Sequence, residues 1–288
     1  MKKMIFLFLV TALVSCKGRK NLVEPPAYSV FLQKEFTEAD HRSAFADFSF
    51  WKSRVQQEPS NQVYLLQAAY ASLRLFSING QIAHLQAGDS LLRDASAILG
   101  NKDPEILYAL AQAAIKQHRF PDAVDFSEQG YRAKGDPYIY RLLAFDAAME
   151  TGNTGQAGLH LSTIRDKSSF DYLIRKSKWD DHHGDLAKAI ESMEAAAEKV
   201  KGRHTPLYCW TLANLGDMYG HAGRIEDAYR CYLRVLGEDS SYLHALKGIA
   251  RIAFSHDRNT EEAKKILCFI QRQTASPDTW LQLADIAQ

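Results

Sequence analysis

The chain has 288 residues, a length that suits either about two globular domains or one elongated array of repeats. Hydrophobic residues make up 46% of it and charged residues 24%, which excludes disordered, collagen-like and multi-spanning membrane chains. The formal charge of +1 gives no global attraction to nucleic acid, so no nucleic-acid partner is expected, and 8 Pro with 16 Gly favour a mainly helical protein.

The first residues have the pattern of a targeting segment. Lys2 and Lys3 precede an apolar run at residues 4–14. A run of this length matches the core of a signal peptide and is too short to span a bilayer. We therefore expect the start of the chain to direct export.

The segment Leu13-Val14-Ser15-Cys16 closes this run and resembles a bacterial lipoprotein signal, in which an aliphatic residue, a spacer and a small residue precede an invariant Cys. The resemblance implies that residues 1–15 are removed and that Cys16 is lipidated as the first residue of the mature chain. Loss of the two signal lysines changes the formal charge from +1 to −1. Two or three acyl chains would give a stable anchor. The alternative is a Cys that merely ends an uncleaved signal.

The residues after Cys16 bear on location. Residues 17–20 are Lys, Gly, Arg and Lys, without an acidic residue. In lipoprotein families, Asp directly after the Cys favours inner-membrane retention in some bacteria, and acidic tracts mark surface export in others. The resemblance therefore implies the outer membrane of a Gram-negative bacterium, facing the periplasm.

Residues 16–43 show no clear periodicity. They contain Pro25 and Pro26, which disfavour a continuous helix. We expect this stretch to be a tether with a short docking segment near residues 28–32.

Apolar residues recur with helical period from about residue 61 onward, in pairs of segments separated by short turns. One pair carries a distinctive set of large, small and turn residues: Leu212, Leu215, Gly216, Tyr219, Gly223, Ala228 and Tyr232. These offsets resemble the tetratricopeptide repeat (TPR), a helix-turn-helix of about 34 residues. Small Gly216 and Ala228 would let the two helices approach closely while Tyr232 fills the seam beside them.

The same offsets recur along the chain. Copies begin near residues 104, 138, 170, 209 and 243, with a partial copy from 277, and residues 44–103 form divergent N-terminal helical hairpins. The predicted fold is all-α, a right-handed superhelical solenoid of TPR helix-turn-helix repeats; the alternative is a plain helical bundle. The last copy stops inside its first helix at Gln288, so either the chain continues or this helix docks on another surface.

The strong catalytic motifs are missing from the sequence: it has no phosphate-binding Gly loop, HExxH, paired CxxC or nucleophile elbow. We expect a protein that is not an enzyme and has no cofactor. The weak metal candidates are His182 and His183, in a turn rich in Asp and His. Other repeats place an imidazole at a comparable turn: His118, His221 and His256. The cysteines after Cys16 lack ligand-like spacing and are expected to be buried thiols: Cys209, Cys231 and Cys268.

The resemblance to TPR proteins implies a concave groove lined by first helices. The exposed positions there, our candidates for protein or peptide binding, would be Trp210, Asp217, His221, His244, Lys247, Arg251 and Phe254. Lys247 and Arg251 are four residues apart and so share a helix face. Two cations beside aromatic residues could hold a peptide carboxylate and an apolar side chain. The Asn residues that complete the clamp in clamp-type family members are absent.

The predicted function is therefore that of a membrane-anchored, non-enzymatic TPR adaptor that binds a protein or peptide segment of the cell envelope. The first alternative is a metal-handling or enzymatic periplasmic protein that uses its His-rich turns. A weaker alternative is a purely structural spacer that retains no partner.

Replacement of Cys16 tests the anchor. Cys16→Ser removes the thiol that would be acylated, so incorporation of labelled fatty acid and recovery in the membrane fraction should both be lost. Cys268→Ser serves as the matched control and should leave both unchanged. Equal fatty-acid labelling of the two variants would contradict lipidation at Cys16.

Overall fold

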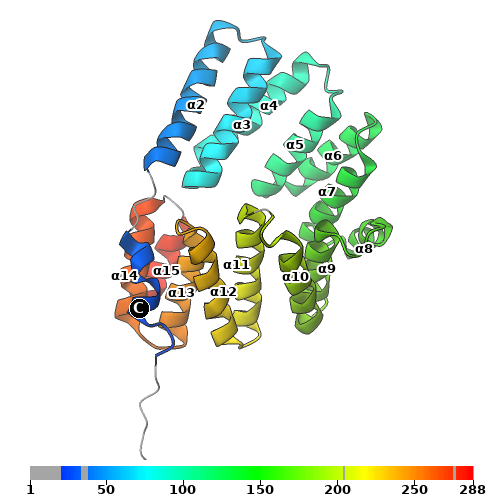
Figure 1. Cartoon of the computed structure of the whole chain (residues 1–288). Helices are drawn as coiled ribbons and strands as arrows, with labels where there is room; N and C mark the ends of the chain where they lie inside the picture. Colours follow the sequence, from blue (N-terminus) through cyan, green and yellow to red (C-terminus); the bar gives the residue numbers. More distant parts are fainter. Residues whose placement is uncertain (1–20, 34–37, 204, 275–276, 288) are drawn as a thin grey trace, which may run out of the picture.

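The computed structural model describes residues 21–33, 38–203, 205–274 and 277–287. Within these ranges the regular structure is entirely helical, and the helices pack mainly on their neighbours in the sequence (Figure 1). None of the helices described is long and apolar enough to cross a membrane. The all-α prediction is confirmed, while the predicted signal peptide and Cys16 lie outside the described residues.

The first described elements are α1 (Pro25–Tyr28), a 3₁₀ helix (Ser29–Gln33) and α2 (Glu38–Gln57). Helix α2 begins six residues before the boundary at residue 44 that we expected for the first hairpin, so the last part of the expected tether is helical. Tyr28, Phe31 and Leu32 pack against the C-terminal repeats, as expected for the docking segment near residues 28–32, and the contact extends back to Leu22 and Val23.

The rest of the chain forms antiparallel helical hairpins. In chain order these pair α3 (Gln62–Asn79) with α4 (Ile82–Ile98), α5 (Pro104–Lys116) with α6 (Phe120–Arg132), α7 (Pro137–Glu150) with α8 (Thr154–Thr163), α9 (Phe170–His182) with α10 (Leu186–Val200), α11 (Thr205–His221) with α12 (Ile225–Glu238), and α13 (Leu243–Ser255) with α14 (Thr260–Gln273); α15 (Pro277–Ala287) follows.

Local sequence explains where these helices start and stop. The side chain of Asp103 accepts hydrogen bonds from the amides of Glu105 and Ile106, at 3.0 and 3.2 Å, and Pro104 occupies the first turn of α5. Between α11 and α12, Gly223 adopts a left-handed φ of +73°, which reverses the chain without side-chain strain. Capping and turn residues of this kind define the short turns that make each hairpin antiparallel.

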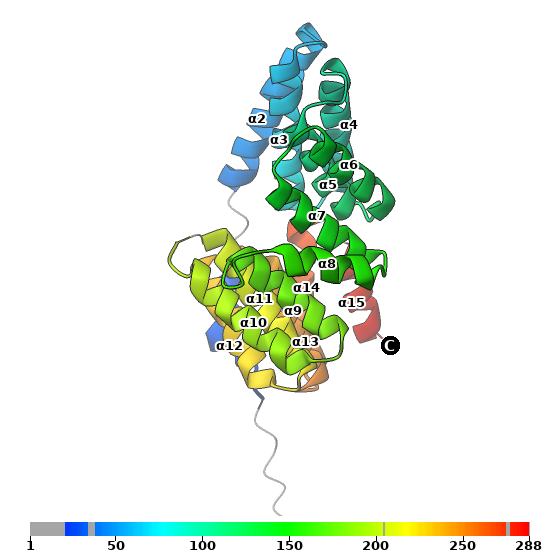
Figure 2. The same ribbon diagram turned by 90° about the vertical axis from the view of Figure 1, so that its right-hand side faces the viewer.

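The array turns back on itself and forms two layers. Helices α2–α6 make the upper layer and α9–α15 the lower layer, with α7 and α8 at the side that joins them (Figures 1 and 2). The layers meet where the Thr274 hydroxyl, after α14, donates to the Asn79 carbonyl at 3.1 Å. Residues 195 positions apart are thus brought together by the accumulated rotation of the repeats.

The largest buried cluster spans α10–α14 of the lower layer and also includes Val23 and Tyr28 from the N-terminal segment. At its centre, the ring of Tyr232 is 1% exposed and lies between two helical glycines. A Cβ at Gly216 of α11 would lie 2.7 Å from this ring, and one at Gly248 of α13 would overlap it. The glycines therefore make the space that lets one tyrosine join two successive repeats.

Adding a methyl group at Gly248 should destabilise the array. Gly248→Ala forces the Tyr232 ring to move and should lower the free energy of unfolding by about 1–3 kcal/mol. Gly237→Ala is the matched control, because Gly237 is also helical but a Cβ there meets no atom within 4 Å. That control should raise stability by about 0.5–1 kcal/mol. Urea unfolding measures both, and equal effects would contradict the close packing.

Candidate functional site

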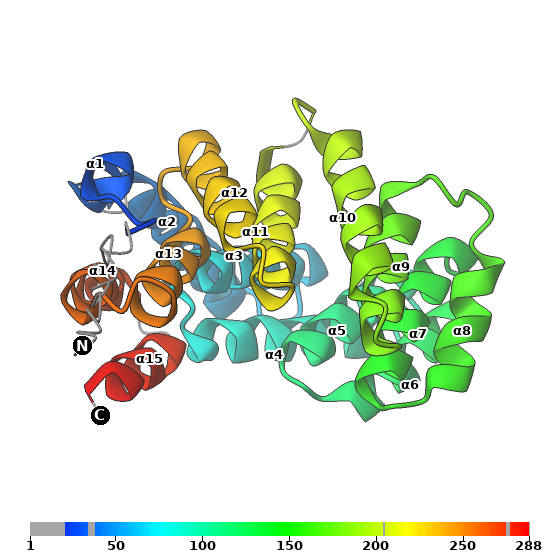
Figure 3. The same cartoon turned by 90° about the horizontal axis from the view of Figure 1, so that it is seen from below.

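Ion pairs connect the first helices of successive hairpins along one face of the array. They join Asp146 to Arg175 and Glu150 to Lys178 between α7 and α9, Asp217 to Arg251 between α11 and α13, and Lys247 to Asp278 between α13 and α15. The N···O distances are 2.6 Å for the first three and 3.7 Å for the last. In Figure 3, α11, α13 and α15 lie on the inner side of the lower layer, with α12 and α14 outside them. We call this inner face the groove, because it carries the first-helix residues Asp217, Lys247 and Arg251 that the sequence analysis assigned to a concave groove.

Asp217 is the centre of the groove in the lower layer. Its Oδ1 accepts hydrogen bonds from the Tyr232 hydroxyl at 2.7 Å and from Nη2 of Arg251 at 2.6 Å. Its Oδ2 lies 2.7 Å from Nε2 of His244. Three of the predicted binding residues, Asp217, His244 and Arg251, are thus brought together, and the buried Tyr232 fixes their position from below.

The surroundings of Asp217 favour its ionised form. Burial alone would raise the pKa of this carboxyl, but the hydrogen bonds from His244 and Tyr232 and the charges of His244 and Arg251 outweigh it. The pKa of Asp217 therefore lies below its usual range. At neutral pH the groove holds a fixed carboxylate that is already surrounded by donors.

The two cations predicted to hold a partner's carboxylate each face a carboxylate of this chain. Arg251 pairs with Asp217, although half of its side chain is exposed, and Lys247 lies near Asp278 and is only 15% exposed. An incoming carboxylate must therefore compete with Asp217 or Asp278. Simple charge attraction to two unpaired cations does not describe this site.

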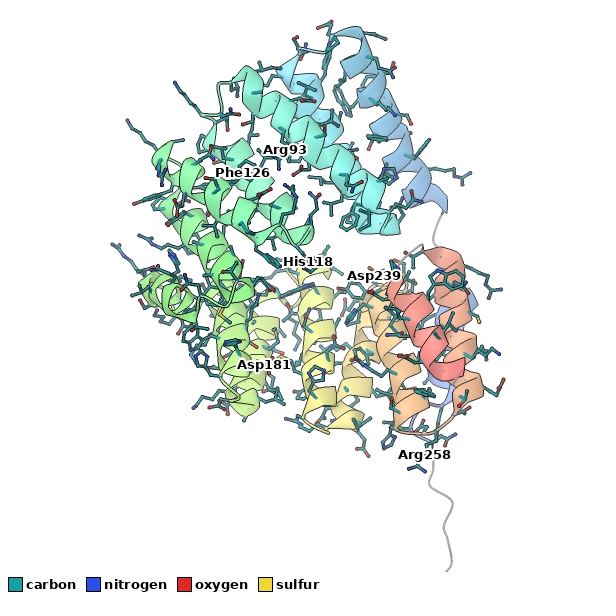
Figure 4. All side chains as sticks on the ribbon, turned by 180° about the vertical axis from the view of Figure 1, so that it is seen from behind. Arg93, His118, Phe126, Asp181, Asp239 and Arg258 are labelled. Carbon is teal, nitrogen blue, oxygen red and sulfur yellow. The ribbon has the colours of Figure 1, made fainter. Side chains whose placement is uncertain are left out.

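A cavity of about 690 Å³ lies between the two layers, which we call the interlayer cavity. Its lining combines the end of α3 with the start of α13 and their neighbours: Phe76, Ser77, Ile78, Gly80, Asp239, Ser241, Tyr242, Leu243, His244, Lys247, Thr274 and Asp278. Figure 4 shows Asp239 at the edge of the lower layer that faces the upper one. The cavity brings the predicted His244 and Lys247 together with Phe76 and Ile78, which the sequence analysis missed because they lie in the divergent first hairpin.

The remaining predicted groove residues lie outside the interlayer cavity. His221 lines a cavity of about 170 Å³ together with Asp217 and Arg251. Phe254 and Arg251 line another of about 240 Å³ beside α15. Trp210, on α11, is 39% exposed and lines none of these three. The candidate surface is therefore a row of hollows along the groove, of which the interlayer cavity is the largest.

The weak metal candidates do not form a ligand set. His183 places Nδ1 2.7 Å from the Trp179 carbonyl oxygen, and its ring lies against that indole at a centroid distance of 4.1 Å. His182 contacts the ring of His183 edge-on. Among the residues that the structure describes, no three His, Cys, Asp or Glu side chains gather in a way that could hold a metal ion.

The three cysteines of the lower layer are not joined by disulfides. Cys209 and Cys231 are buried, and Cys268 is partly buried. Burial raises the pKa of both Cys209 and Cys231 to about 11. These thiols stay protonated at neutral pH and are poor nucleophiles.

No protein-family model matches the sequence, and no curated protein matches it. Solved structures share its fold. A tetratricopeptide repeat protein from Parabacteroides merdae has a TM-score of 0.61 at 13% identity, over 91% of this chain and 100% of that chain. A chain of the APC/C hetero-tetramer Cut9-Hcn1 has a TM-score of 0.61 at 14% identity, and the match covers 87% of this chain and 47% of that chain. Yeast Tom70 has a TM-score of 0.58 at 10% identity, and the match covers 86% of this chain and 58% of that chain.

This chain therefore spans about half the length of the Cut9-Hcn1 and Tom70 chains. At such low identities the likeness shows the fold alone. That fold is an all-α, right-handed superhelical solenoid of tetratricopeptide repeats, and the prediction made from the repeat offsets is confirmed.

The network around Asp217 should contribute to stability in a pH-dependent way. Asp217→Asn removes the charge that His244, Tyr232 and Arg251 surround, and should cost about 1–3 kcal/mol at pH 7. Because the folded-state pKa lies below the ordinary value of about 3.9, this contribution is complete above that pH and is lost as the pH falls through the folded-state pKa.

Urea unfolding of wild type and Asp217→Asn from pH 7 downward measures this. The difference between them should stay constant to about pH 5 and shrink below about pH 4. Asp94→Asn, at an exposed position on α4, is the control and should change stability little at any pH. A difference that grows as the pH falls below about 4 would contradict the depressed pKa.

Proposed function

We propose that this tetratricopeptide-repeat solenoid is a lipid-anchored, non-enzymatic adaptor that binds a peptide or protein segment of the cell envelope through its concave groove. The observation that carries the proposal is the interlayer cavity, where apolar side chains from both ends of the array meet the charged floor of the groove. Such a site needs no catalytic group to select a ligand.

The size of the cavity favours a segment of a partner as the ligand. A volume of about 690 Å³ accommodates a few side chains. Phe76, Ile78 and Leu243 offer apolar contacts, while His244 and Lys247 offer donors near the carboxylate of Asp278. A short segment with an apolar anchor flanked by polar groups has the matching chemistry.

The ion pairs along the groove support a mode of recognition in which a partner binds by its shape and its polar groups are selected by the existing pairs. A partner that brings a charge must replace one side of an existing pair, such as Lys247 with Asp278 or Arg251 with Asp217. Charges that do not find such a replacement are penalised by desolvation, which discriminates against wrong partners. The TPR neighbours are consistent with this use of the scaffold as a protein-interaction surface.

The membrane part of the proposal is supported by the lipoprotein-like segment that ends at Cys16. The residues that follow Cys16 are not acidic, which supports the periplasmic face of an outer membrane. In this setting the adaptor would present its groove to envelope proteins while acyl chains hold it at the bilayer.

Peptide selection with matched variants tests the groove. A phage-displayed peptide library selected on the wild-type protein should yield segments that share an apolar anchor. Ile78→Asp puts a charge into the wall of the interlayer cavity and should weaken binding of these peptides at least about ten-fold, because an apolar anchor loses its site.

Ile98→Asp makes the same change at an exposed position of α4 outside this cavity, and binding should be retained. Circular dichroism melting of both variants checks that each remains folded. Equal affinity of the two folded variants, or loss of binding in both, would overturn the assignment of the cavity.

A further inference from the structure

The segment before α1 is held to the C-terminal repeats by a buried carboxylate. The amides of Leu22 and Val23 donate to the two oxygens of Asp257, Oδ1 at 3.0 Å and Oδ2 at 2.8 Å. Asp257 lies in the turn between α13 and α14, and its side chain is 1% exposed. Nδ1 of His256 is 2.8 Å from the same Oδ1. We call this contact the Asp257 clasp.

The electrostatics of the Asp257 clasp keep the carboxylate charged. Burial would raise the pKa of Asp257, but the hydrogen bonds from the Leu22 and Val23 amides and from His256 outweigh burial and lower it. Hydrogen bonds from amides to an ionised carboxylate are about twice as strong as those between neutral groups.

Apolar packing extends the clasp along the outer face of the lower layer. Val23 is 2% exposed and Tyr28 fully buried, both within the core cluster of α10–α14. Leu22, Phe31 and Leu32 pack against the same cluster. Figure 3 shows α1 near α14, on the side opposite to α15. The segment is thus seated by its backbone at one end and by side chains along its length.

The length of the chain limits the distance between the Asp257 clasp and Cys16. Five residues lead from Cys16 to Asn21, and whatever their conformation they cannot span more than about 18 Å. Helix α14 alone, with 14 residues, is about 21 Å long. An acyl chain on Cys16 would therefore be tied to the chain at a point next to the α13–α14 turn, because Leu22 and Val23 are bound there.

We propose that the Asp257 clasp orients the whole array on a lipid surface, with the edge that carries the α13–α14 turn facing the bilayer and the upper layer projecting away from it. This inference rests on the proposed lipid anchor at Cys16. It places the interlayer cavity on the side of the lower layer remote from the bilayer, where a partner in the aqueous phase reaches it.

Charge at the membrane-facing edge does not provide this orientation. In the neighbouring α11–α12 turn, Arg224 is paired with Asp227 at 2.7 Å, and in the α13–α14 turn the exposed Arg258 adjoins the ionised Asp257 (Figure 4). These two turns therefore present no excess of positive charge that would attract anionic headgroups. The orientation is therefore expected to persist at high salt and to depend on the clasp.

Fluorescence quenching on vesicles tests the orientation. Residues 16–288 with Cys268→Ser are coupled through Cys16 to a maleimide lipid in phosphatidylcholine vesicles that also contain a nitroxide-headgroup lipid. The buried Cys209 and Cys231 remain unmodified. A dye is attached through p-azidophenylalanine at exposed position 260, at the start of α14, or at exposed position 102, in the α4–α5 turn of the upper layer. Quenching should be strong at 260 and weak at 102, at low and at high salt.

Asp257→Ala should lower the ratio of docked to undocked N-terminal segment roughly ten- to a hundred-fold, because two amides lose a charged acceptor. The contrast in quenching between positions 260 and 102 should then largely disappear. Asp239→Ala removes a carboxylate that accepts from the Ser241 amide at the edge facing the upper layer, and should preserve the contrast.

Equal quenching at the two positions in the wild type would overturn the proposal, and so would a contrast that Asp257→Ala leaves unchanged. The lipid is attached chemically in this experiment. Its outcome is therefore independent of cellular lipidation, which fatty-acid labelling of Cys16→Ser tests separately.

Discussion

The insertion of Tyr232 between two glycines is the packing constraint on which the groove depends. Its ring fills the space that Gly216 and Gly248 leave between α11 and α13, and its hydroxyl continues outward to the carboxylate of Asp217. Core packing and groove electrostatics are therefore parts of one contact. A shift of α13 relative to α11 would move Arg251 and His244 away from Asp217, so the spacing of the repeats controls the charge distribution that a ligand meets.

The groove differs in this respect from a cationic clamp. Ion pairs such as Asp217 with Arg251 join neighbouring repeats, so the charges of both partners are already compensated within the chain. The proposed ligand would gain little from long-range attraction and would depend on contact in the interlayer cavity, which Phe76, Ile78 and His244 line together. Its specificity would then depend on the distance between the two layers as much as on the side chains of one repeat.

The regular repeat pattern made the packing within a hairpin predictable from the sequence, but the contacts between distant segments were not predictable. The offsets from Leu212 to Tyr232 predict a close-packed hairpin, because the helical period and the small residues are encoded within 34 residues. The meeting of Asn79 with Thr274 depends on small rotations summed over many repeats, which no local pattern reports. The sequence did not reveal the Asp257 clasp for another reason: its donors are backbone amides, which any residue other than proline at positions 22 and 23 would supply.

Both distant contacts end on the same part of the molecule. The N-terminal segment is fixed on the outer face beside α14, and the first hairpin reaches the end of α14 at Thr274.

In a solenoid each hairpin is stabilised by its neighbours, so the array can open between layers while every hairpin stays intact. The segment proposed to bind in the interlayer cavity would touch Phe76 of one layer and Leu243 of the other, and it would therefore bind a closed arrangement better than an open one. Ligand binding and closure of the superhelix are then thermodynamically linked, because a ligand shifts an equilibrium by its difference in affinity for the two states. In the proposed setting, where the clasp holds the lower layer at the bilayer, closure would move the upper layer, α2–α6, relative to the lower layer.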